Sequence, residues 1–177
     1  MTGPRALFAG ADWRVAPLRP AHDAGRVQAL FEAARDYAEL ETGDGPPADA
    51  GRAFFTDAPP RRPDAEMLKL GVEAAGIGLA GLIDVVIDYP HPACWFIGLM
   101  LLRPEARGRG LGGAALEGLA GHAAANGAEA LRLVALERNP RGRAFWAAHG
   151  FRVVRRLPPE RFGRRVHVRC EMERRPL

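Results

Sequence analysis

The sequence has few cysteines and almost no lysine. Cys94 and Cys170 are the only cysteines among 177 residues, and neither belongs to a CxxC pair. This content excludes a disulfide-rich framework and favours a reducing compartment. We expect no metal site. Lys69 is the only lysine among 25 basic residues, so the net charge of +4 comes almost entirely from arginine.

Long apolar runs are also lacking. No stretch approaches the roughly 20 apolar residues that a membrane-spanning helix requires. Residues 1–10 lack the basic-then-apolar pattern of a signal peptide. We therefore expect a cytoplasmic protein that does not engage a membrane.

The basic balance is compatible with an anionic partner, either nucleic acid or an anionic cofactor. The abundance of Arg, Ala, Gly and Pro is more simply explained by a bias toward GC-rich codons. No long arginine run with interleaved aromatic residues occurs, and aromatic residues make up only 7% of the chain. Nucleic acid is therefore the disfavoured alternative, and a steep salt dependence of binding would be its signature.

The length and the apolar fraction of 47% fit one domain covering residues 1–177. A domain of this size buries roughly 70% of the surface that its unfolded chain exposes, so it needs no disulfide or metal to hold a core.

The order of the predicted elements indicates a mixed α/β fold. Apolar residues recur at helical spacing between residues 21 and 41, where Val27, Leu30 and Phe31 share one face. Further helices are expected at 111–126 and 139–150, and a short one at 50–55 within a Gly/Pro-rich loop, 42–63. Strands are expected at 13–18, 67–73, 78–89, 94–102, 130–136, 151–157 and 165–172. We expect a twisted mixed sheet with helices on both faces.

A glycine-rich turn joins the apolar strand 94–102 to the following helix. The turn reads Arg107-Gly108-Arg109-Gly110-Leu111-Gly112-Gly113, so it contains four glycines and two arginines. Glycine lets the main chain approach a bulky anion, and the first N–H groups of a helix have no partner inside the helix. The helix dipole adds positive potential there, so the turn is a candidate pyrophosphate site.

Two motifs carry a resemblance to a known family. Arg107, Gly110 and Gly112 match motif A of the GNAT acetyltransferases, which is Arg or Gln, two residues, Gly, one residue, then Gly or Ala. Motif B of that family places an Asn before a helix that runs through Phe-Tyr to Gly-Phe. Asn139, Phe145, Trp146, Gly150 and Phe151 stand at that spacing. The resemblance covers residues 78–151 and extends more loosely to 13–37.

The resemblance implies a GNAT fold and an N-acetyltransferase that moves the acetyl group of acetyl-CoA to a primary amine within a ternary complex. It also implies how coenzyme A is held. The main chain at Met100, Leu101 and Leu102 should meet the pantetheine arm, and residues 107–113 should hold the pyrophosphate. Asn139 should touch pantetheine, and Phe145 should pack beside it. The residues expected to bind the cofactor are Met100, Leu101, Leu102, Arg107, Gly108, Arg109, Gly110, Leu111, Gly112, Gly113, Asn139 and Phe145. Arg61 and Arg62 in the long loop are candidates for the 3′-phosphate or an acidic acceptor, against the alternative of two solvated arginines.

The sequence departs from the family at Trp146, where relatives often carry a Tyr whose hydroxyl protonates the departing thiolate. An indole is only an N–H donor. A thiolate whose thiol has a pKa of about 8.5 can leave without a proton donor. An amine with a pKa of about 10 must first lose a proton, so a general base matters more here than a general acid. We expect Trp146 to shape the wall of the groove.

The base is open between Glu137, which ends the strand 130–136, and Asp84, which alternates with Ile83 and Val85. Asp88 and His91 are further alternatives. For each, a solvated or ion-paired role is the alternative to catalysis.

We expect the acceptor to be a small molecule or a peptide with a free amine. Amino acids, peptide N-termini, polyamines and aminoglycosides are all left open, as is a homodimer. The rival hypothesis is a non-catalytic acyl-CoA-binding or sensing domain, which Trp146 and the undecided base favour. Acyl transfer to an amine panel separates the two.

Overall fold

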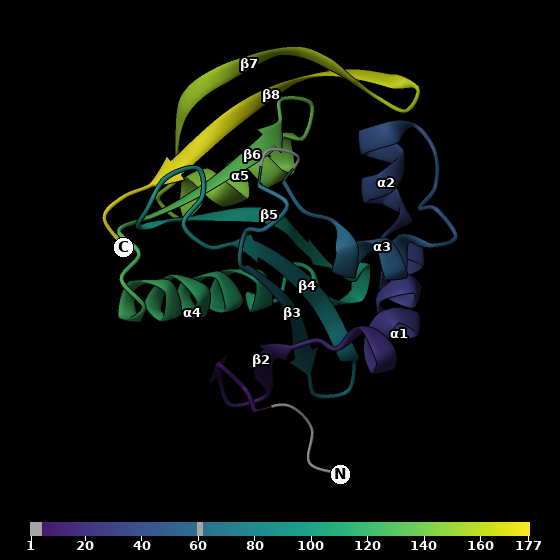
Figure 1. The fold of residues 1–177 in the computed structure, drawn as a ribbon. Helices are drawn as coiled ribbons and strands as arrows, with labels where there is room; N and C mark the ends of the chain where they lie inside the picture. Colours follow the sequence, from purple (N-terminus) through teal and green to yellow (C-terminus); the bar gives the residue numbers. More distant parts are fainter. Residues whose placement is uncertain (1–4, 60–61) are drawn as a thin grey trace.

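A mixed sheet forms the centre of the computed structural model, which describes residues 5–59 and 62–177 (Figure 1). Arg61 lies outside the described residues. The strands follow the order β1-β2-β3-β4-β5-β6-β8-β7. Their bounds are β1 (Phe8–Ala9), β2 (Trp13–Pro17), β3 (Met67–Ala74), β4 (Gly78–Val86), β5 (Cys94–Leu102), β6 (Ala130–Leu136), β7 (Arg152–Phe162) and β8 (Arg165–Arg174). Within these ranges every neighbouring pair is antiparallel except β5 and β6, which are parallel.

Helices cover both faces of the sheet, as expected. They are α1 (Pro20–Ala33), α2 (Arg35–Thr42), α3 (Ala50–Thr56), α4 (Leu111–Ala125) and α5 (Pro140–Ala148), with a 3₁₀ turn, η1, at Pro104–Ala106. α1, α2 and α3 gather on one side of β4, whereas α4 runs across the other face (Figure 1). The mixed α/β fold with helices on both faces is confirmed.

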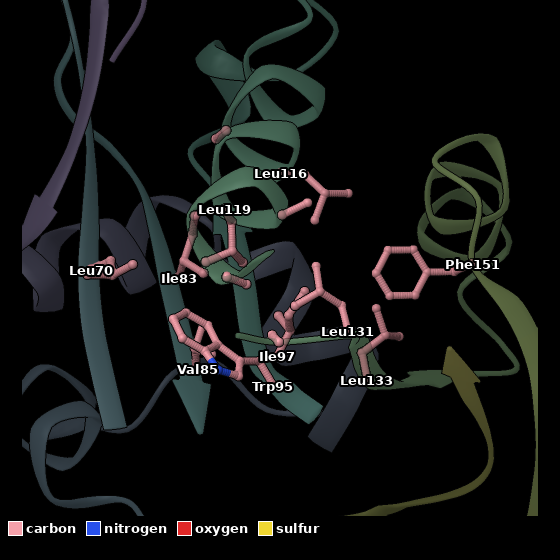
Figure 2. Close-up of a cluster of buried hydrophobic side chains, with 14 of the residues drawn as sticks. Leu70, Ile83, Val85, Trp95, Ile97, Leu116, Leu119, Leu131, Leu133 and Phe151 are labelled. Carbon is pink, nitrogen blue, oxygen red and sulfur yellow. The ribbon is translucent and has the colours of Figure 1, made fainter. Parts of the chain in front are cut away.

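Two apolar clusters result from the alternation of side chains along the strands. On the α4 face, Ile83 and Val85 pack with Trp95, Leu116 and Leu119 (Figure 2). On the opposite face, Leu82 and Leu101 pack against Leu30 of α1 and Phe54 of α3. Successive residues of β4 therefore face alternately toward α4 and toward the α1 and α3 helices.

The prediction of a single helix over 21–41 is wrong, because the helix is interrupted at Ala34. This residue has φ −93° and ψ 32°, outside the helical region, and separates α1 from α2. No Gly or Pro stands at the break, which is why periodicity did not reveal it. The break gives α2 a direction of its own.

The C-terminal hairpin is longer than expected. β7 extends to Phe162 and β8 to Arg174, and almost all of β7 is exposed at the edge of the sheet. Pro158 and Pro159 interrupt the hydrogen-bonding edge of β7, a feature that discourages pairing with another chain. The strand expected over 78–89 ends at Val86.

None of the helices in the described ranges combines the length and hydropathy that crossing a bilayer requires.

The contact between α1 and α3 depends on Gly51. A Cβ at this position would lie 2.3 Å from the Ala24 carbonyl oxygen and 2.7 Å from the Gln28 main-chain nitrogen. We predict that Gly51→Ala separates the helices and lowers the free energy of unfolding by about 1–3 kcal/mol, measured by urea denaturation.

Gly25→Ala is the matched control, because a Cβ on this residue of α1 meets nothing within 4 Å. Alanine there should stabilise the helix by about 0.5–1 kcal/mol. Equal effects of the two substitutions would contradict the close contact at Gly51.

Candidate functional site

The parallel strands β5 and β6 part midway along their length. They pair from Cys94 opposite Ala130 to Ile97 opposite Leu133, and each then continues for several residues beyond the paired stretch. A wedge, which we call the splay, opens between 98–102 of β5 and 134–136 of β6. Main-chain groups along its sides are free to pair with an extended ligand, as an added strand would be.

A β-bulge at Gly98 marks the point of divergence. Asp84 of β4 lies opposite Leu99, whereas Val85 lies opposite Ile97, so Gly98 has no partner in the register. Gly98 is exposed although it lies in the middle of a central strand. The absence of a side chain here keeps the base of the splay open.

Main-chain direction along β5 decides which groups face the splay. The Arg103 N–H donates to the Ala80 carbonyl at 2.9 Å, toward β4. Because main-chain groups alternate along a strand, those of Leu101 also face β4, and those of Met100 and Leu102 face the splay. The Leu102 carbonyl accepts from Arg107 Nε at 2.9 Å. Met100 and Leu102 thus carry the free N–H groups.

The turn after β5 presents open space in front of two glycines. Gly108 and Gly110 have φ of 73° and 79°, in the left-handed region, and a Cβ on either would meet nothing within 4 Å. The Ala114 N–H donates to the Gly110 carbonyl at 3.0 Å and begins the ladder of α4. The N–H groups ahead of it, from Leu111 to Gly113, are those that an anion at a helix N-terminus accepts from.

The two following glycines serve packing. A Cβ at Gly112 would lie 3.3 Å from Leu102 Cδ1 and 3.5 Å from Phe145 Cε2. A Cβ at Gly113 would lie 2.6 Å from His149 Nε2. These glycines let α5 approach the first turn of α4, which places Phe145 beside the turn.

Comparison with known proteins agrees with this geometry. The profile of the acetyltransferase (GNAT) family matches residues 27–151. The chain belongs to the GNAT acetyltransferase family. It is an N-acetyltransferase that uses acetyl-CoA as its acetyl donor and an amine as its acceptor. A search of the curated proteins finds no significant match.

Several solved structures share the fold. An acetyltransferase from Thermus thermophilus is 27% identical, with a TM-score of 0.76 over 98% of this chain and 100% of that one. Spermidine N-acetyltransferase from Vibrio cholerae, solved in complex with CoA and spermine, is 18% identical, with a TM-score of 0.71 over 94% and 97%. A Salmonella typhimurium acetyltransferase that modifies the N-terminal serine of a 50S ribosomal protein is 13% identical, with a TM-score of 0.80 over 97% and 99%.

The open space at Gly108 and Gly110, the free N–H groups of α4 and the splay together fit coenzyme A in this GNAT protein. The turn would hold the pyrophosphate, and the splay edge at Met100 and Leu102 would hold the pantetheine arm. Arg109 is exposed beside the turn. These roles stay predictions. The main-chain groups of Leu101 face β4 rather than the splay, unlike those of Met100 and Leu102.

Arg107 is already engaged by an acidic residue of α2. Its guanidinium donates to both carboxylate oxygens of Asp36, and the hydrogen bonds from Arg107 hold the pKa of Asp36 below its usual range. No local pattern in the sequence indicates this pair, because 71 positions separate the two residues. An anion in the turn must share Arg107 with Asp36.

The motif B residues Asn139, Phe145 and Trp146 lie at the start of α5 and along its partly buried side, and Gly150 and Phe151 follow the end of the helix. The Asn139 side chain accepts from the Gly142 N–H at 2.9 Å and caps α5. The Trp146 ring packs edge-on against Phe145 at 4.9 Å and Phe151 at 5.3 Å between centroids. Trp146 thus supports Phe145 from within an aromatic cluster.

The two base candidates have different surroundings. Both oxygens of Glu137 accept from Arg156, at 2.8 and 2.9 Å, and this pairing lowers the pKa of Glu137. A carboxylate stabilised in this way is a weak base, so the geometry argues against Glu137.

Asp84 is 8% exposed and lies on the face of the α1 and α3 helices. Burial raises its pKa, whereas the Lys69 ammonium 3.0 Å from Oδ2 acts in the opposite sense. Asp84 Oδ1 is buried without a hydrogen-bond partner among the described residues. A Cβ on Gly98 would stand 3.2 Å from Oδ2, so the exposed glycine leaves the carboxylate within reach of a ligand in the splay.

Lys69 is a residue that the sequence reasoning missed. Its Nζ donates to the Asp57 carbonyl at 3.0 Å and lies 5.1 Å from the centroid of the Phe54 ring. The available signal was the single lysine of the chain on a strand adjacent to that of Asp84. The contact follows only from the register of β3 and β4, which places Lys69 opposite Asp84.

We predict that Asp36→Asn tightens binding of CoA by about three- to tenfold. The substitution releases Arg107 and removes a negative charge near the pyrophosphate site. Calorimetric titration with CoA measures the change. Glu39→Gln is the control, because Glu39 lies on the same helix and pairs with Arg35 instead. Weaker binding to Asp36→Asn would mean that Asp36 positions Arg107.

Proposed function

We propose that the acceptor of this N-acetyltransferase is a primary amine that reaches the splay from the α2–α3 face, and that Asp84 accepts its proton. The observation that carries this proposal is the buried Asp84 carboxylate beside the exposed Gly98 at the base of the splay. Small-molecule amines and peptide N-termini both fit this chemistry.

Proton removal is the first requirement of the reaction. A primary ammonium has a pKa near 10 and must lose one proton before its nitrogen can attack. A carboxylate raised in pKa by burial takes a proton more readily than a solvated one. The Lys69 ammonium opposes this rise in the pKa and favours the ionised carboxylate, the form that can accept a proton.

The attacking nitrogen then forms a bond to the acetyl carbon, and the carbonyl oxygen gains negative charge. The free N–H groups of Met100 and Leu102 face the splay and would stabilise that oxyanion. The C–S bond breaks, the thiolate leaves as CoA, and the second amine proton passes to solvent. Holding both substrates in one wedge supplies much of the rate.

A panel of primary amines tests the proposed function. Thiol release from acetyl-CoA should occur only when an amine is added, and mass spectrometry should find the acetylated amine. Release that is independent of amine, or none with any amine, would contradict acetyl transfer and favour an acyl-CoA sensor.

The pairing of Asp84 with Lys69 predicts how kcat depends on pH. Asp84→Asn should lower kcat by about 10²–10⁴-fold, because the proton acceptor is lost. Activity requires the carboxylate, so kcat falls as the pH drops through the pKa of Asp84. Lys69→Met removes the charge that lowers this pKa, so the acidic limb of the kcat profile should move to higher pH.

Lys69→Arg, which keeps the charge, is the control and should leave the limb closer to that of the unchanged protein. The profile is measured at saturating acetyl-CoA and amine. An acidic limb that does not move in Lys69→Met, or full activity in Asp84→Asn, would exclude Asp84 as the base.

Trp146 should act through packing. We predict that Trp146→Phe retains most of the activity, whereas Trp146→Ala loses most of it, because removing the ring leaves a void beside Phe145 and Phe151 at a cost of about 3 kcal/mol. Trp146→Tyr should raise kcat by less than about tenfold, which is 1.4 kcal/mol of barrier. A larger gain at unchanged affinity for acetyl-CoA would show that the thiolate needs an acid.

A further inference from the structure

The end of α2 is fastened to β8 by hydrogen bonds between segments far apart in the sequence. Arg165 Nε donates to the Glu39 carbonyl at 2.9 Å, and His167 Nε2 donates to the Glu41 carbonyl at 2.8 Å. Figure 1 shows the tip of the β7–β8 hairpin beside the end of α2. The last turn of α2 and His167 therefore form one surface.

This surface lies at the mouth of the splay. Asp36 at the start of α2 is held by Arg107, which also binds the end of β5 through Leu102. His167 lies two residues before Arg169, the β8 partner of the last β6 residue. Asp36 and Glu41 are five positions apart, or about 7.5 Å along a helix. α2 thus extends from the turn after β5 to β8, the strand that pairs with β6.

His167 and Asp84 lie on the same face of the sheet. Cys170 and Met172 of β8 belong to the cluster on the α4 face, so His167, an odd number of residues away, points to the opposite face. Asp84 alternates with Ile83, which also faces α4. The residues at the end of α2 and the proposed base consequently border the same side of the splay.

Glu41, Tyr37 and His167 together hold more acceptors than donors. A carbonyl oxygen only accepts, so Nε2 of His167 carries the proton, and Nδ1 of the neutral ring is an acceptor. His167 is 1% exposed, and its Nδ1 is buried with no partner in the described part of the chain. Glu41 Oε1 accepts from the Tyr37 hydroxyl at 3.3 Å. Burial raises the pKa of Glu41, against smaller opposing effects of Tyr37 and His167.

The neighbouring cations are held elsewhere. Arg165 donates to the Glu39 carbonyl, and Arg169 is paired with Glu160. Arg164 is paired with Asp44. The Phe162 ring, 6.1 Å from the His167 ring between centroids, forms an apolar side of the same surface. Among the described residues no arginine or lysine pairs with the half-buried Glu41 carboxylate, and Nδ1 of His167 has no hydrogen-bond partner, so both can accept from an ammonium group.

We infer that Glu41, Tyr37 and His167 form a subsite for a second ammonium group of the acceptor, which makes the acceptor a diamine or polyamine. This inference rests on the proposed function. An ammonium carries three N–H donors and one positive charge, which suit the Glu41 carboxylate and His167 Nδ1. The first amine loses its proton at Asp84, while the second stays charged at Glu41.

Matched amines test the subsite. Linear α,ω-diaminoalkanes and monoaminoalkanes with the same numbers of carbon atoms are compared as acceptors at saturating acetyl-CoA. The protein should acetylate the best diamine with a KM at least tenfold below that of its monoamine, at similar kcat. This comparison uses the unchanged protein, so it does not depend on the folding of a variant.

Glu41→Gln should raise the KM for the diamine by about ten- to a hundredfold and leave the KM for the monoamine within about threefold. Glu39→Gln is the control on the same helix, since it keeps the main-chain carbonyl that Arg165 uses. A structural role of Glu41 would instead affect both amines equally, and that result would overturn the subsite.

Binding separates the subsite from the proposed function. Calorimetric titration of diamine and monoamine into the CoA-saturated protein measures the subsite without turnover. Preferential binding of the diamine without acetylation would support the subsite and contradict the proposed function. Acetylation of both amines with equal KM and equal affinity would support the proposed function and overturn the subsite, as would absence of diamine binding.

Discussion

The loss of pairing between β5 and β6 after Ile97 and Leu133 is the constraint on which the rest of the site depends. Two parallel strands that remained paired would leave no room for a ligand and no free main-chain groups. The bulge at Gly98 directly follows the last paired residue of β5, and a Cβ there would lie 3.2 Å from Asp84 Oδ2, so the glycine lies between the splay and the proposed base. β5 continues from this bulge into the glycine turn, so the proposed cofactor site and the proposed base lie on either side of one irregularity of the sheet.

α2 connects the two substrate sides of this opening. Asp36 in its first turn pairs with Arg107 at the glycine turn, and its last turn accepts hydrogen bonds from Arg165 and His167 of β8. An anion that draws Arg107 away from Asp36 therefore acts on the helix that carries Glu41. If acetyl-CoA and the acceptor bind as proposed, both would contact α2, and their binding would then be coupled through this helix.

Local patterns predicted most of the elements and the glycine turn between β5 and α4, because periodicity, glycines and the Asn139 cap are local signals. Long-range contacts were beyond them. The break at Ala34 has no Gly or Pro, and the pair Arg107–Asp36 joins residues 71 positions apart. The choice between Asp84 and Glu137 depended on strand register, which sets Lys69 beside the first, and on the neighbouring hairpin, which sets Arg156 beside the second.

The pair of Lys69 and Asp84 is best understood as a functional cost. Both side chains lie largely within the protein, and Asp84 Oδ1 lacks a hydrogen-bond partner among the described residues. Burying a charged pair costs desolvation that its attraction does not always recover, and an apolar pair of similar volume is often more stable. An incompletely satisfied carboxylate next to an open glycine is unfavourable for stability alone. The proposed role as a proton acceptor accounts for both properties, an oxygen with spare hydrogen-bonding capacity and a neighbouring cation that favours the ionised carboxylate.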